Sequence, residues 1–138
     1  MKKILAMLLS LMMVFSIPMT CFAAYDDVEK TNTEFGTMTG KLSGNLIIDR
    51  KEVGYSTETT KKASRLIVFI DVKIYSTGQT IIDGKRDREY KNETNTSYVS
   101  GGWQCHTPSY NKQKLSAFAT HEARGKTSLV GYTGVKNF

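Results

Sequence analysis

Cys105 and His106 are adjacent and carry the side chains of a nucleophile and a general base. Catalysis by such a pair needs a hydrogen bond between the thiol and the imidazole, and an acid that orients the imidazole. Neighbouring residues of a strand point to opposite faces of the sheet, so this pair cannot easily meet. His121, with Glu122 or Glu93, would have to reach Cys105 instead, and nothing in the spacing requires that. We therefore expect no catalytic residues and no enzyme activity.

Metal ligands are equally sparse. A metal site uses three or four side chains in a compact pattern. The two histidines, Cys105 and Glu122 form no such pattern. We expect His121 to be a cross-strand partner of Val130, and we predict neither a metal nor another cofactor.

Aromatic residues are concentrated in the second half of the chain. Trp103 lies close to His106 and Tyr110, and rings of this kind can stack on sugars or on a cell-wall polymer. Tyrosine and tryptophan also combine an apolar ring with a polar tip, which suits a protein interface. The same rings would serve equally well in a hydrophobic core, which is their more common role. The residues predicted to bind a ligand are Trp103, His106, Tyr110, His121 and Tyr132.

The elements that would position these side chains are strands. The stretch Ala63–Ser76 is the longest apolar run outside the N-terminus, and β-branched and aromatic residues dominate it. Its apolar residues alternate with polar ones, which is the period of a half-buried strand. We predict the central strand of a small antiparallel domain, with one face formed by Leu66, Val68, Ile70, Val72 and Ile74.

The stretches before this strand also favour extended structure. From Gly36 to Ile48 apolar and polar residues alternate, and Gly40 and Gly44 suggest a bend or another backbone packed closely against the strand. Val53–Thr60 is predicted to be an edge strand. Residues 24–35 are polar without a clear period, and we expect a loose, disordered leader there rather than a first strand.

Two hairpins are predicted in the second half of the chain. One has a three-residue loop, Thr77–Gln79, and the other a two-residue Gly125-Lys126 loop in a type II′ turn. The expected cross-strand pairs are Ile74 with Ile82, Lys73 with Asp83, Ala119 with Tyr132, and His121 with Val130. About seven strands joined by short turns predict an all-β domain over residues 36–138, a small antiparallel β-sandwich or flattened barrel.

The N-terminus is typical of a bacterial signal peptide. Lys2-Lys3 precedes an apolar run, Ile4–Ile17, and Cys21–Ala24 supplies small residues for cleavage. We expect cleavage after residue 23, with cleavage after Ala24, an uncleaved anchor and a lipoprotein attached at Cys21 as alternatives. The mature chain would be secreted, either extracellular or associated with the cell envelope, with no membrane span.

Removing the signal peptide takes away two lysines, so the formal charge falls from +6 to 17 − 13 = +4. This charge favours anionic polymers or serves solubility alone. The mixed-charge run Lys85–Lys91 is nearly balanced, and we expect no nucleic-acid partner. Only Cys105 remains as a thiol, so the core must form without an internal disulfide. Cys105 could be free or pair between chains, but burial is its usual state.

The strands Ala119–Arg124 and Leu129–Thr133, together with a signal peptide and a small β domain, resemble those of secreted bacteriocins of the lactococcin 972 type. The resemblance implies a toxin-like antimicrobial protein as an alternative function. The residues themselves favour a secreted, non-enzymatic β-sandwich that binds a cell-wall polymer, another surface glycan or a protein partner.

Overall fold

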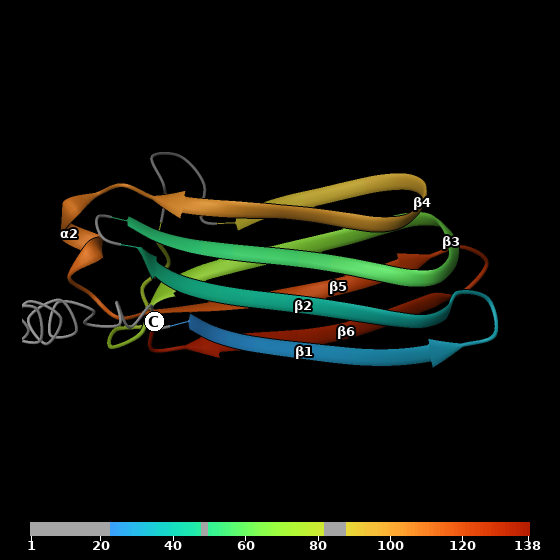
Figure 1. The fold of residues 1–138 in the computed structure, drawn as a ribbon, viewed down its shortest axis with the longest axis horizontal. Coiled ribbons are helices and arrows are strands. Elements are labelled where there is room, and N and C mark those ends of the chain that lie inside the picture. Colours follow the sequence, from blue (N-terminus) through green and yellow to red (C-terminus); the bar gives the residue numbers. More distant parts are fainter. Residues whose placement is uncertain (1–22, 48–49, 82–87) are drawn as a thin grey trace, which may run out of the picture.

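The computed structural model describes residues 23–47, 50–81 and 88–138 of the chain, so the predicted signal peptide lies outside the described residues except for Ala23. Strands dominate these ranges, and one short helix lies between the fourth and fifth strands (Figure 1). The elements are β1 (Ala23–Asn32), β2 (Gly36–Ile47), β3 (Arg50–Ile74), β4 (Arg88–Cys105), α2 (Pro108–Asn111), β5 (Leu115–Arg124) and β6 (Ser128–Lys136).

All the strand pairs are antiparallel, and the long strands β3 and β4 belong to both layers of the fold. The ladder between them shifts register between Glu58 and Ala63, and both strands turn back at the same end of the molecule (Figure 1). The first sheet is β1, β2, Arg50–Thr59 of β3 and Tyr98–Cys105 of β4. The second sheet is β6, β5, the rest of β3 and the rest of β4.

These two sheets form a nearly closed, flattened barrel, because β1 and β2 lie against β6 and β5. The predicted fold class, an all-β antiparallel sandwich or flattened barrel, is therefore confirmed. Residues 63–74 lie between β4 and β5, as expected of a central strand. All five residues of its predicted inner face are buried, with exposed fractions of 0 to 5%.

Two expectations about the first sheet were wrong. Residues 24–32, expected in a disordered leader, form β1, which pairs with β2 along its whole length. Main-chain hydrogen bonding stabilises this strand at the edge of the sheet, so it needs no strong apolar period. Val53–Thr60 was expected at an edge but lies between β2 and β4. Its threonines Thr57 and Thr59 are buried, because the interior there is partly polar.

Both hairpin registers also differ from the prediction. Lys73 pairs with Thr80 instead of Asp83, because the turn comes earlier than expected. The Gly78 amide donates a 2.8 Å hydrogen bond to the Ile74 oxygen, and Gly78 adopts a φ of 70° that favours glycine. The predicted partners Ile82 and Asp83 lie outside the described residues. In the last hairpin three residues form the loop, and His121 pairs with Gly131 rather than with Val130. Gly125 lacks the positive φ of a type II′ turn, so the expected two-residue loop does not form.

Candidate functional site

The outer face of the first sheet is formed by short and polar side chains that the strand register places in rows. Asn45 of β2, Glu52 of β3 and Gln104 of β4 are direct cross-strand neighbours. The next row in the same direction is Ser43, Gly54 and Gly102. Residues two apart along a strand share a face, so the two rows form one surface. A row of amide and carboxylate groups thus borders a floor that carries almost no side chains.

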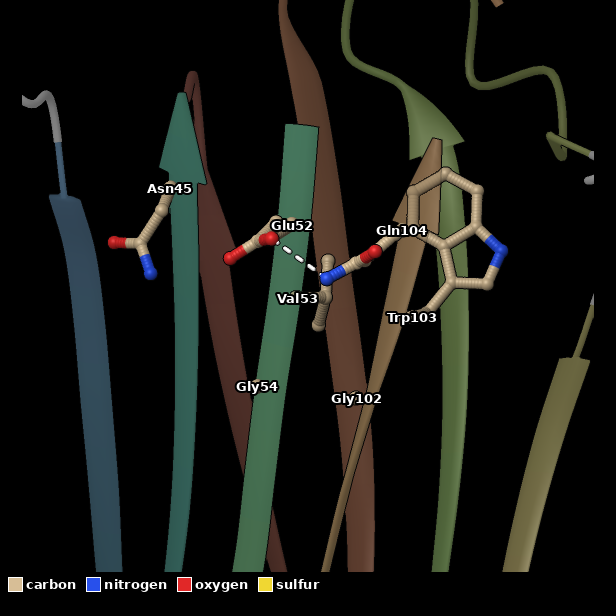
Figure 2. Close-up of a pocket in the computed structure, with 7 residues that line it drawn as sticks. All are labelled: Asn45, Glu52, Val53, Gly54, Gly102, Trp103 and Gln104. Atoms are coloured by element: carbon tan, nitrogen blue, oxygen red, sulfur yellow. Dashed lines mark hydrogen bonds between the residues drawn. The ribbon is translucent and has the colours of Figure 1, made fainter. Parts of the chain in front are cut away.

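Glu52 is held in place by its neighbours. Its Oε1 accepts a hydrogen bond of 2.7 Å from Gln104 Nε2 and one of 2.8 Å from Arg50 Nε. Figure 2 shows Glu52 and Gln104 pointing toward each other, with Asn45 on the other side of Glu52. Within the described part of the chain, both hydrogen bonds to the Glu52 side chain reach Oε1, so Oε2 remains able to accept one from a ligand.

Two adjoining hollows lie over this surface. One has a volume of about 370 Å³, and its lining residues are labelled in Figure 2. The other, about 330 Å³, shares Gly54 with the first and continues across β1 to β4 between Tyr25 and Tyr98. These two tyrosines are 59% and 53% exposed. We call the two hollows together the outer groove, and its polar and aromatic lining residues are Asn45, Glu52, Gln104, Ser43, Lys41, Ser56, Ser100, Tyr25 and Tyr98.

Of the predicted binding residues, only Trp103 lines the outer groove. Trp103 pairs with the buried Val53, and its indole is half-buried against the core and turned away from Glu52 (Figure 2). His106 is exposed in the segment that follows β4. Tyr110 lies on α2 and is partly buried against the core. These three share one region of the chain, and neither hollow of the outer groove is lined by more than one of them.

His121 lies in the core and is fully buried, so it cannot contact a ligand at the surface. Its Nδ1 shares a hydrogen bond of 2.7 Å with Thr57 Oγ1, and its Nε2 one of 2.8 Å with Thr133 Oγ1. Burial lowers the pKa of His121 from 6.5 to about 4, and the charge of Asp26 opposes this shift. The imidazole ring packs on Gly40, where a Cβ atom would overlap it. A close approach to Gly40 was predicted for another backbone, but it is the imidazole ring of His121 that packs against this glycine.

Tyr132 is 71% exposed on the outer face of the second sheet. It pairs with Thr120, and the ring of Phe118 covers Gly134 on the same face. Tyr132 therefore lies on the opposite side of the molecule from the outer groove.

The residues considered for catalysis do not assemble around the thiol. Cys105 is a free, fully buried cysteine, as its expected burial suggested. The ring hydrogen bonds of His121 go to threonines. In the ranges that the structure describes, no three His, Cys, Asp or Glu residues are grouped to hold a metal ion. Within those ranges, no helix is both long and apolar enough to cross a bilayer.

No family model, curated protein or solved structure matches this chain.

The outer groove was missed in the sequence because its residues are ordinary polar ones, far apart in the chain. Asn45 and Ser43 fall on the polar positions of the predicted strand Gly36–Ile48, so their outward direction could be predicted. That Glu52 and Gln104 stand in the same row depends on the register of three strands. Tyr25 was assigned to a disordered leader, and its strand was needed to bring it to the groove.

Proposed function

We propose that this protein is a secreted, non-enzymatic binding protein whose outer groove holds a cell-surface glycan. The observation that carries the proposal is the row of Asn45, Glu52 and Gln104 beside a glycine and serine floor, with two exposed tyrosines across the groove.

The chemistry of the groove suits sugars. Carboxylate and amide side chains accept and donate hydrogen bonds to hydroxyl and acetamido groups, and Glu52 is already oriented by Arg50 and Gln104. Preorganised side chains lose little conformational entropy on binding. Gly54 and Gly102 let a flat ring approach the sheet, while Tyr25 and Tyr98 offer aromatic surface.

The size of the groove suits a short stretch of polymer. From Asn45 to Lys41 is four residues along β2, or roughly 13 Å at the rise of a strand. This length accommodates two or three sugar rings. An acetamido group matches the paired acceptor of Glu52 and donor of Gln104, so N-acetylated wall glycans are the proposed class.

The test is retention of the purified mature chain on insoluble peptidoglycan at low salt, followed by titration with N-acetylglucosamine oligomers. Removing a hydrogen bond to a charged group costs about 1.5–3 kcal/mol, so Glu52→Ala should weaken binding about ten-fold or more. Tyr25→Ser combined with Tyr98→Ser should also weaken it, whereas Tyr132→Ser on the second sheet serves as the matched control. Absence of retention by the unmodified chain, or equal binding by all variants, would contradict the proposal.

A second candidate function is action on the envelope of neighbouring cells as an antimicrobial protein. The observation that favours it is the aromatic outer face of the second sheet, where Phe118 is 40% exposed and Tyr132 71%. Phe69 and Val130 lie on the same face, because Phe69 pairs with Thr120, the partner of Tyr132, and Val130 precedes Tyr132 by two residues. Growth inhibition by the mature chain, lost on Tyr132→Ser, would support this function, and inert protein at micromolar dose would exclude it.

A further inference from the structure

A separate cavity of about 270 Å³ lies between the segment that follows α2 and the C-terminal residues Asn137 and Phe138. Helix α2 and the C-terminus lie at the same end of the molecule (Figure 1). The lining of the cavity comes from β2, β3, the last residue of α2, the segment after α2 and the segment after β6. Three of the lining residues are lysines, three carry side-chain amides, and none of the lining residues has an acidic side chain. The lining residues are Leu46, Lys51, Asn111, Lys112, Gln113, Lys114, Asn137 and Phe138.

Lys51 is the unusual member of this set, because it is only 3% exposed. Its Nζ donates a 2.6 Å hydrogen bond to the Phe138 main-chain oxygen and lies 5.9 Å from the centroid of that ring. Among the described residues, the Phe138 oxygen is the one hydrogen-bond acceptor of Lys51 Nζ, although an ammonium group has three N–H donors. A buried charge with unfilled donors is costly unless an ion or another polar group satisfies it.

A second lysine increases the positive potential. Lys114 lines the same cavity, and its charge, together with burial as the larger cause, lowers the pKa of Lys51. Lys112 adds a third ammonium group to the lining. Like charges that share a cavity favour an anion between them, since the anion removes their mutual repulsion.

We propose that this cavity binds a phosphate group. Phosphate carries up to two negative charges and several oxygen acceptors, which match the ammonium donors of Lys51, Lys112 and Lys114. The amide of Asn137 lies in the same lining, while Gln113 Nε2 already donates to the Ser109 main-chain oxygen. The phosphate could be a free ion or part of a glycerol phosphate chain, and the two sources share this chemistry.

The experiment is a two-armed titration of the full mature chain by calorimetry and amide NMR at low ionic strength. One arm uses inorganic phosphate and the other a glycerol phosphate oligomer, each against sodium chloride of equal ionic strength. We expect binding in at least one arm, with the largest shifts at the amides of 112–114 and 137–138. Saturation by phosphate alone identifies a site for the free ion, and tighter binding of the oligomer identifies a polymer site.

Lys114→Gln should weaken this binding about ten-fold, because it removes one charge-assisted hydrogen bond. Lys126→Gln is the matched control, since Lys126 is an exposed lysine in the loop between β5 and β6. Lys51→Met tests the buried ammonium, and circular dichroism checks its folding. If that variant does not fold, Lys114→Gln still decides. No binding in either arm, or equal loss in Lys114→Gln and Lys126→Gln, would overturn the proposal.

Discussion

Replacing His121 by glutamine should remove a large part of the acid sensitivity of the fold. His121 is buried with hydrogen bonds to Thr57 and Thr133, and its pKa is lowered from 6.5 to about 4. A neutral imidazole can donate at one nitrogen and accept at the other, and the two hydroxyl groups can adapt to this. Protonation would add a charge to the core, and burial makes that charge costly.

The sign and size follow from proton linkage. Between about pH 6.5 and pH 4 the unfolded chain binds a proton at His121 that the folded chain does not, so stability falls as the pH falls through this window. The full difference is about 3 kcal/mol, at about 1.4 kcal/mol for each pH unit. From about pH 7 to about pH 5 the loss should be about 2 kcal/mol. Such a loss is a sizeable part of the stability of a small domain.

Urea denaturation of the unmodified chain and of His121→Gln, at about pH 7 and about pH 5, measures this difference. Glutamine keeps a donor and an acceptor but does not titrate in this range. The unmodified chain should lose about 2 kcal/mol more than the variant. His106→Gln, which changes the exposed histidine, should behave like the unmodified chain. An equal loss in the unmodified chain and in His121→Gln would refute the assignment of the buried histidine.

Three further perturbations test the packing. Gly40→Ala places a Cβ against the ring of His121 and should lower the free energy of unfolding in urea by about 1–3 kcal/mol. In the His121→Ala background the same substitution should cost much less, and an equal cost in both backgrounds would contradict the contact. Glu34 accepts hydrogen bonds from two amides of the β5–β6 loop, so Glu34→Ala should speed hydrogen exchange at those amides, and unchanged exchange would argue against this link. Cys105 is fully buried, so a thiol reagent should label the native chain far more slowly than the urea-unfolded chain, and equal rates would contradict its burial.

The fold class could be predicted from the sequence because alternation of apolar and polar residues is a local property. Residues 66–74 show it most clearly, and all the predicted inner-face residues there are buried. β1 could not be predicted in this way, because an edge strand with few apolar residues is fixed mainly by its main-chain partner. The same applies to Val53–Thr60, whose interior position depends on β4, which follows much later in the chain.

Register and site were harder to predict for the same physical reason. The loop after β5 is held by the carboxylate of Glu34, which bonds Thr127 and the Lys126 amide from the β1–β2 turn. This distant contact accompanies a loop one residue longer than expected. A register shift of one residue exchanges the two faces of a strand. Tyr132 therefore pairs with Thr120 instead of Ala119, and its side chain lies on the outer face of the sheet. His121 looked like a surface ligand because histidine is polar, while its two buried threonine partners lie on other strands.

The most direct test of the glycan proposal is amide chemical-shift mapping of residues 24–138 during titration with N-acetylglucosamine oligomers. The outer groove predicts the largest changes at Ser43, Gly54 and Gly102, with smaller changes at the Tyr25 and Tyr98 amides. The chemical shifts of the second-sheet amides around Tyr132 should not change. Shifts centred on the second sheet, or no shifts at saturating oligomer, would contradict the proposal.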